Sequence, residues 1–525
     1  MPMVSDEPVT EPARRGAAAR ALPRLRLDHL WAIFALGLVA AFISLVPTAP
    51  HDFWWHLKAG ELIAAGALPA TNMFAWAVPA EAPYIYQSWL GEWLFYQLYS
   101  LGGLPLAIFA RNLLGAAAYA LVAWEARARG GSWRLAALAA LLAAAMALNN
   151  FTARTQIWSW LPFMATMILL GRYVEGRLPR RWLAALPAIM LFWVNAHGGF
   201  VMGLLVAGAF AVGETLRRLL RQPGALYWDQ LRPLYLAAAA MAAATLANPL
   251  GPGIVGYVLD LLGDAPSQQL VREWQSPTPR NLAGAAFYLG VLALIAAFAF
   301  ARRRPSITDV LLVCGLAWQA FIGVRYVVWF GMVAMPIVAQ SLARPRSAPG
   351  AAAPPSRRER GGGTVANLLV AALLALLVLA VQPWTKHLLG LPAPYQALFA
   401  EVPGAPQLFS AETPVAAVAH LLAEPCAGPI FNEMGYGSYM AWALYPAARH
   451  YIDPRVELFD LAIWERYVEV SAGRGVAAFL DERGVACVVL DTRTQAGLAE
   501  AMPAVPGWRR TLAEGRSEVW RRGGP

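Results

Sequence analysis

Polar side chains early in the chain have types and a spacing suited to acid–base chemistry. In the segment HDFWWHLKAGE, Asp52 and His56 stand four residues apart, so they share one face if the segment is helical. A carboxylate and an imidazole on one face suit a general base with a histidine partner, or two ligands of a metal ion. The alternative is that Asp52 only caps a helix beside a belt of aromatic residues. We take Asp52, His51 and His56 as candidate catalytic residues.

Two arginines are candidates for binding a phosphate group. Arg154, in the segment FTARTQ, and Arg325, between two apolar segments, carry planar guanidinium groups that can donate two hydrogen bonds to one phosphate. The alternative is that each side chain extends to the lipid headgroups and has no specific ligand. The sequence leaves both interpretations open.

Four further residues are candidates for contacting or supporting a substrate. His197, in NAHGG, is followed by two glycines that permit the close approach of a ligand, although a solvated turn between helices has the same pattern. Glu92 and Glu273 each adjoin a tryptophan, a side chain that stacks on sugar rings or anchors at the membrane interface. Either acid could be a second carboxylate beside Asp52. Asn248, in NPLG, extends the set.

Composition indicates the class of protein that holds these residues. Hydrophobic residues make up 58% of the 525 residues and charged residues 14%, with a mean hydropathy of +0.46, which is typical of a membrane protein. The net charge of +10 could suggest nucleic acid as a partner, but the basic residues lie in loops between apolar segments and not in a patch with readout residues. We therefore exclude nucleic-acid binding and assign the excess to membrane topology.

Apolar runs predict about 11 transmembrane helices, since about 20 residues cross a bilayer. They start near residues 30, 104, 135, 157, 182, 199, 234, 282, 308, 326 and 365. The first run lacks a clear cleavage site, so we expect a retained anchor.

Arginine and lysine gather in every second loop, and positive charge stays on the cytoplasmic side of a membrane. The basic clusters lie at 14–26, 127–134, 172–181, 217–232, 302–304 and 344–360. This pattern places the N-terminus in the cytoplasm and the C-terminus outside. The candidate polar residues then collect at the outer ends of the spans, where ionisable groups are costly and are usually kept for a site.

The predicted organisation has five parts. Residues 1–29 form a cytoplasmic tail, and residues 30–342 form a transmembrane core with outer loops at 48–103 and 248–281. The Pro/Gly/Arg-rich stretch 343–363 is a cytoplasmic linker to a last transmembrane helix at 364–382. Residues 383–525 form an extracytoplasmic domain.

Strand and helix signals alternate in this last part, which predicts a small α/β domain. GPIFNE and VACVVLD are typical of buried strands, a long helix is expected from Trp464 to Glu482, and a strand pair ends the chain. Polar residues at the predicted strand ends favour solvated turns over a second site; they are Asn432, Asp453, Arg455 and Glu457.

The three cysteines show neither CxxC nor Cys/His spacing, so a zinc site is not supported. Cys426 and Cys487 could pair in an oxidising compartment or remain free thiols, because pairing needs Cα atoms within about 7 Å.

Several motifs, taken in order, resemble bacterial membrane proteins grouped with GT-C type glycosyltransferases. The motifs are HDFWWHLKAGELI, QSWLGEWLFYQLY, TARTQIWSW, NAHGGFVMG, NPLG, REWQSP, FNEMGYGSYMAW and YIDPRVELF, which together span nearly the whole chain. The resemblance implies a GT-C-like helical core and a lipid-linked sugar donor, typically a polyprenyl phosphate sugar. It also implies a functional acid early in the first outer loop, a position that Asp52 matches, as catalytic base or metal ligand.

The pair His51-Asp52 stands where many relatives have two adjacent acids. No cofactor is therefore assigned, and a divalent metal ion is left open. The expected function is a bacterial inner-membrane glycosyltransferase, embedded in membrane lipids, that moves a sugar from polyprenyl phosphate to an envelope glycan, lipid or protein.

Two other function classes remain. One is a transporter or flippase of a lipid-linked or polar solute, which the lack of an internal sequence repeat disfavours. The other is a non-catalytic envelope assembly protein that binds a partner through its tail.

Overall fold

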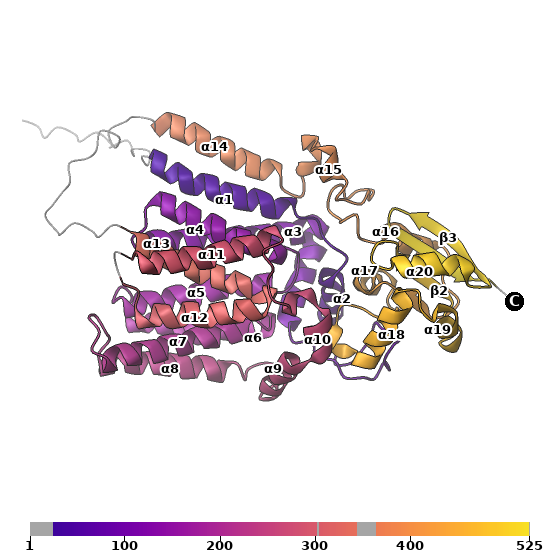
Figure 1. The fold of residues 1–525 in the computed structure, drawn as a ribbon, viewed down its shortest axis with the longest axis horizontal. Coiled ribbons are helices and arrows are strands. Elements are labelled where there is room, and N and C mark those ends of the chain that lie inside the picture. The colour runs from indigo at the N-terminus through magenta and orange to yellow at the C-terminus, as the bar shows by residue number, and fades with distance from the viewer. Residues whose placement is uncertain (1–24, 302–303, 344–363, 524–525) are drawn as a thin grey trace, which may run out of the picture.

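The computed structural model describes residues 25–301, 304–343 and 364–523. Most of the expected cytoplasmic tail and all but the first residue of the expected linker lie outside these residues. Figure 1 shows a bundle of roughly parallel helices with a mixed α/β domain at one end. We call this the domain end of the bundle.

A helix begins close to each predicted start of a span except the second, where α3 begins earlier, at Trp89, and kinks next to the predicted start. The bundle helices are α1 (Leu27–Leu45), α3 (Trp89–Ala128), α4 (Trp133–Met146), α5 (Ile157–Val174), α6 (Ala185–Ala196), α7 (Phe200–Leu219), α8 (Trp228–Ala244), α11 (Leu282–Ala299), α12 (Ile307–Ile322), α13 (Val327–Leu342) and α14 (Thr364–Ala380). Among the described residues, six helices are long and apolar enough to cross a membrane, and further apolar helices are shorter. The chain is a multi-pass membrane protein.

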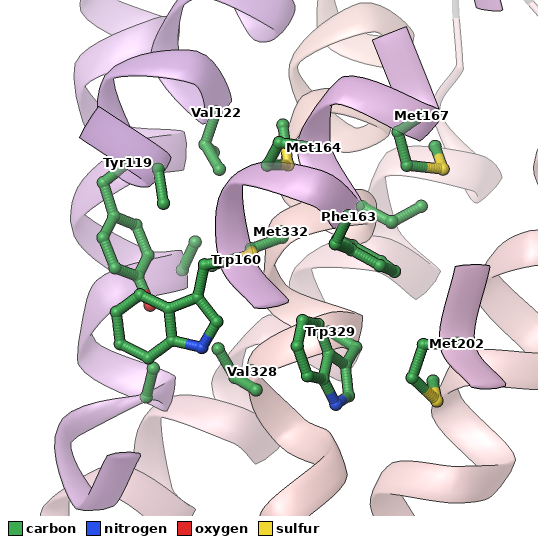
Figure 2. Packing of buried hydrophobic residues seen from close by; sticks show 14 of the residues in the cluster. Tyr119, Val122, Trp160, Phe163, Met164, Met167, Met202, Val328, Trp329 and Met332 are labelled. Atoms are coloured by element: carbon green, nitrogen blue, oxygen red, sulfur yellow. The ribbon is translucent and has the colours of Figure 1, made fainter. Parts of the chain in front are cut away.

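Small side chains let the central helices pack closely. The buried face of α4 consists almost entirely of alanine, and α4 contacts α1, α3, α11 and α13. Without the bulk of larger side chains the helix backbones can approach, which is how helices associate inside a bilayer. Larger aromatic residues fill the space farther along: the rings of Phe163 and Trp329 lie 4.9 Å apart, and Trp160 lies against Tyr119 (Figure 2).

A kink in α3 separates its first turns from its membrane-spanning part. Gly102 and Gly103 leave helical geometry, and Gly103 has a φ of 65°, a conformation that glycine adopts without strain. Pro105 follows, and it too interrupts regular helix hydrogen bonding. The turns before the kink pack along α2 (Asp52–Ala64).

The two predicted outer loops contain short helices at the domain end. Loop 48–103 holds α2 and the first turns of α3, whereas loop 248–281 holds α9 (Gly253–Gly263), α10 (Ala265–Leu270) and the 3-10 helix η3 (Arg272–Trp274). In Figure 1, α2, α9 and α10 all lie between the bundle and the α/β domain. Residues from both loops therefore meet at this end.

The C-terminal part is a small α/β domain, as predicted. Its strands β1 (Ile430–Asn432), β2 (Cys487–Asp491), β3 (Trp508–Glu514) and β4 (Ser517–Arg522) have the order β1-β2-β4-β3, with β1 parallel to β2 and the others antiparallel. Successive side chains of a strand point to opposite faces. Val488 and Leu490 thus pack on one face with helices α18 (Leu461–Ser471), α19 (Val476–Glu482) and α20 (Ala496–Ala501). Val489 packs on the other face with α16 (Val415–Ala423) and α17 (Met434–Leu444).

The structure corrects one expectation for this domain and answers one open question. The long helix expected from Trp464 to Glu482 is two helices, α18 and α19, because Gly473 and Gly475 between them adopt φ of 82° and 62°. A Cβ at Gly473 would also lie 2.5 Å from the Gly497 carbonyl oxygen, so the turn packs closely against α20. The open question of the cysteines resolves as a disulfide between Cys426 and Cys487, whose Cα atoms lie 6.2 Å apart. It ties β2 to the loop before β1.

Candidate active site

A cavity of about 300 Å³ lies at the domain end, between the bundle, the two outer loops and the α/β domain. Seven of the nine residues singled out from the sequence line it: Asp52, His56, Glu92, Arg154, His197, Glu273 and Arg325. They come from segments far apart in the chain, so the helix bundle brings them together. The cavity is the candidate active site.

Arg154 lies between two carboxylates at this cavity. Its guanidinium forms ion pairs with Asp52 in the first turn of α2 and with Glu273 on η3. Burial acts to raise the pKa of Asp52, but the charges of Arg154, His56 and His51, together with the Arg154 hydrogen bond, outweigh it and hold that pKa below its usual value. The same two carboxylates raise the pKa of Arg154 against the opposing effect of burial. Asp52 is therefore an ionised carboxylate, able to accept a proton once Arg154 is drawn away.

His56 pairs with Glu92 and not with Asp52. His56 Nδ1 and Glu92 Oε1 are 2.9 Å apart, and both side chains are buried. Asp52 and His56 do share one face of α2, as their spacing predicts, because both line the cavity. Of the two acids considered as a second carboxylate beside Asp52, Glu92 is the partner of His56.

His197 is held as a neutral hydrogen-bond donor. The Gly199 backbone N–H donates to His197 Nδ1 at 2.9 Å, so this nitrogen carries no proton. The Ser159 hydroxyl lies 2.8 Å from the same nitrogen and accepts a hydrogen bond from Trp193. Burial lowers the pKa of His197 to about 3. The proton of the neutral ring therefore sits on Nε2, and His197 lines the cavity.

Arg325 reaches the cavity from the 3-10 helix η4 (Val324–Tyr326), just before α13. Its guanidinium carbon lies 4.4 Å from the ring centre of Trp274, a cation–π contact. In the part of the chain that the structure describes, no carboxylate lies within 4 Å of it. Arg325 is thus a cavity-lining cation that no acid neutralises.

Two residues expected at the site lie outside the cavity lining. His51 precedes α2 and packs against the start of α17, where a Cβ added at Gly435 would lie 2.7 Å from His51 Nδ1. The Asn248 amide donates to the backbone oxygens of Thr245 and Gly251, and so shapes the turn before α9. These contacts explain both residues by local structure.

Comparison with solved structures identifies the fold. The mycobacterial arabinofuranosyltransferase AftD aligns with a TM-score of 0.52 and 16% identity, over 96% of this chain and 42% of AftD. ArnT from Cupriavidus metallidurans in the apo state aligns with a TM-score of 0.51 and 18% identity, over 94% of this chain and 98% of ArnT. The chain has the GT-C fold. No protein family model and no curated protein sequence matches it.

The α/β domain contributes to the cavity, which the sequence did not reveal. Pro454, Arg455, Val456 and Glu457 line it together with Tyr84 and Tyr86 of the first outer loop. The expectation of solvated turns is wrong here, because Asn432, Asp453 and Arg455 are buried. The sequence signal for these residues is the aspartate and arginine close together in the motif YIDPRVE. Charged residues are mostly exposed, so this pair does not by itself indicate a buried position at a cavity.

The residues present do not form a conventional metal site. Among the residues that the structure describes, no three His, Cys, Asp or Glu side chains group as metal ligands. Asp52 and Glu273, the two carboxylates that approach each other, are joined through Arg154.

Proposed function

We propose that the chain is a membrane glycosyltransferase that moves a sugar from a polyprenyl phosphate donor to an acceptor hydroxyl on the extracytoplasmic side. The observation that carries this proposal is Arg154 between Asp52 and Glu273 in a cavity that Arg325 also lines. In such a site a cation that can bind a phosphate lies next to a carboxylate that can accept a proton. The GT-C fold supports the same reaction class by analogy.

The apolar side of the cavity suits a lipid-linked donor. Val201, Met202 and Leu205 of α7, an expected membrane span, line it, as do Leu261 and Leu262 near the end of α9. Leu205 is 47% exposed and Leu262 is 46% exposed on the outer surface of the protein. Side chains that line the cavity and also face outward favour lateral entry of a polyprenyl chain from the bilayer.

Donor binding would activate the base. A donor phosphate competes with Asp52 and Glu273 for the Arg154 guanidinium, and Arg325 adds a second positive charge. Once Arg154 turns to the phosphate, the pKa of Asp52 rises, because the charge that lowered it is shared with the donor. The carboxylate then becomes a stronger base when the donor is in place.

The transfer step follows from these positions. The acceptor hydroxyl oxygen attacks the anomeric carbon while its proton passes to Asp52. The bond from the anomeric carbon to the phosphate oxygen breaks, and the electron pair leaves with polyprenyl phosphate. Arg154 and Arg325 stabilise the negative charge on that leaving group. The neutral His197, with its proton on Nε2, can donate to an oxygen of the substrate.

The outward placement of the site rests on two observations. Positive charge in alternate loops predicts that the domain end faces away from the cytoplasm. The disulfide between Cys426 and Cys487 fits an oxidising compartment outside the bacterial cytoplasm. The acceptor is then a glycan, lipid or protein of the cell envelope.

The test is sugar transfer by purified full-length protein in lipid nanodiscs, with a panel of radiolabelled undecaprenyl phosphate sugars and envelope extracts as acceptors. We expect transfer by the wild type and a loss of about 100-fold or more in Asp52→Asn, which cannot accept the proton. Glu81→Gln, an exposed acid of the same outer loop, is the matched control and should remain active. Full activity of Asp52→Asn contradicts the role of Asp52, and no transfer from any donor favours transport or assembly.

A further inference from the structure

The wall that the α/β domain gives to the cavity has its own polar groups. Arg455 is buried there, and its guanidinium donates to both oxygens of Asp453, at 2.9 and 2.7 Å. It also donates to Asn72 Oδ1 at 3.1 Å and to the Tyr86 hydroxyl at 3.4 Å. Because these partners use its donors and Asp453 neutralises its charge, Arg455 positions this wall and does not offer a free cation.

Glu457 differs from Arg455 because most of its hydrogen-bonding capacity is unused. The Tyr84 hydroxyl donates to Glu457 Oε1 at 3.0 Å. Among the described residues, no other side chain donates to this carboxylate, and no cation lies within 4 Å of it. Burial raises the pKa of Glu457, yet the side chain lines the cavity. A partly exposed carboxylate with free lone pairs at a cavity wall can accept hydrogen bonds from a ligand.

Tyr84, which donates to this carboxylate, is one of three aromatic residues that pack together at the cavity. The Tyr84 and Tyr86 rings lie 4.9 Å apart, and Trp55 of α2 lies 6.2 Å from Tyr84 and 6.4 Å from Tyr86, in edge-on contacts. All three residues line the cavity. Aromatic rings contact the C–H groups of a sugar ring, while a carboxylate accepts from its hydroxyl groups. Together they form a surface suited to a polyhydroxylated ring.

Glu457 and the two cations of the expected phosphate site line one cavity. Tyr257 of α9 also lines it, and its hydroxyl lies close enough to Glu457 and Arg325 for both charges to act on it. A sugar joined to a phosphate at Arg325 and Arg154 therefore lies in the same cavity as Glu457. This argues for the transferred sugar of the donor as the ligand at Glu457.

We propose that Glu457, set in place by Tyr84, binds hydroxyl groups of the transferred sugar, so that the α/β domain determines which sugar the enzyme accepts. The inference rests on the proposed function, because it assumes a sugar donor in this cavity. It assigns sugar recognition to a residue about 400 positions from Asp52 in the chain and leaves the proton transfer to Asp52.

Binding measurements test this inference without requiring turnover. Purified full-length protein in nanodiscs is titrated with undecaprenyl phosphate and with undecaprenyl phosphate carrying glucose, mannose, galactose or arabinose. We expect at least one sugar to tighten binding by the wild type. Glu457→Gln should weaken binding of that sugar lipid by about 10- to 100-fold, as expected for lost hydrogen bonds to a charged group, and leave undecaprenyl phosphate unaffected. Tyr84→Phe should show a smaller loss in the same direction.

Two controls separate recognition from misfolding and from failure of the enzyme model. Glu482→Gln, an exposed acid of the α/β domain, should bind like the wild type, and unchanged binding of sugar-free lipid shows that Glu457→Gln is folded. Equal loss of both lipids in Glu457→Gln overturns the inference, as does a wild type for which no sugar tightens binding. Sugar-dependent binding without transfer contradicts the proposed function and leaves the role of Glu457 intact.

Discussion

Arg154 Nε donates a hydrogen bond to Asp52 Oδ2, although 102 residues separate them in the chain. The same guanidinium reaches Glu273, 119 residues away in the other direction. This group of one arginine and two acids compensates a buried cation and keeps the expected base ionised. It predicts how substitutions on each member should differ.

Replacing Arg154 should change the pH dependence of transfer as well as its rate. Arg154→Gln removes the charge that lowers the pKa of Asp52, so the acidic limb of the pH–rate profile should move to higher pH. Loss of the phosphate contact should also reduce kcat/KM by about 10- to 100-fold. Arg154→Lys keeps the positive charge but loses the planar guanidinium that can donate two hydrogen bonds to one phosphate. Its acidic limb should move less than that of Arg154→Gln. An acidic limb that stays in place in Arg154→Gln would show that Arg154 does not control the base.

Removing the Glu273 charge should have the opposite effect on donor binding. Glu273→Gln leaves Arg154 with one charged partner instead of two, so a donor phosphate has less to displace. An ion pair with about a third of the Glu273 side chain exposed is worth up to about 1 kcal/mol, or about fivefold in affinity. We expect tighter binding of undecaprenyl phosphate by up to that factor, measured by titration. Weaker binding would mean that Glu273 itself contacts the donor.

The neutral state of His197 predicts an acid-sensitive stability. Its pKa in the folded protein is about 3, below the value of about 6.5 for an unfolded histidine. Between these values the unfolded chain binds a proton that the folded protein does not, so stability falls as pH drops from about 6.5 toward 3. The thermal midpoint of the wild type should therefore fall more between pH 7 and pH 5 than that of His197→Gln. The exposed His387 provides the control, since His387→Gln should keep the wild-type dependence.

Gly60 lies where α2 and α3 approach closely, so a larger side chain there should be destabilising. A Cβ at Gly60 would lie 2.2 Å from the backbone oxygen of Glu92, so Gly60→Ala must push the helices apart. Overpacking of this kind costs about 1 to 3 kcal/mol, and here it also disturbs the pair of His56 and Glu92. We expect a lower thermal midpoint and reduced transfer. Gly208→Ala on α7 is the control, because the new methyl group meets nothing within 4 Å, and it should keep the wild-type midpoint and transfer rate. Equal midpoints for the two variants would contradict the close packing of α2 against α3 at Gly60.

The disulfide should stabilise the α/β domain. It joins cysteines 61 residues apart, and restriction of the unfolded chain by a loop of that length contributes about 4 kcal/mol. Reductant should lower the thermal midpoint of the wild type. The midpoint of Cys426→Ser should be low from the start and insensitive to reductant, whereas Cys314→Ala, at an exposed free cysteine, should behave like the wild type. A wild type insensitive to a reductant that demonstrably breaks the bond would show that the domain needs no cross-link.

The sequence alone determined the membrane class, the positions of the bundle helices and the α/β character of the tail, since runs of apolar residues and strand patterns are local signals. It also indicated seven residues that line the cavity, because ionisable groups in an apolar sequence stand out. Only the tertiary structure decided which of them pair. His56 contacts Glu92, Arg154 contacts two acids, and Arg455 and Glu457 join the cavity from the α/β domain. Pairing depends on distances of a few ångströms that helix packing sets, and residue spacing carries no such information between segments that belong to different helices.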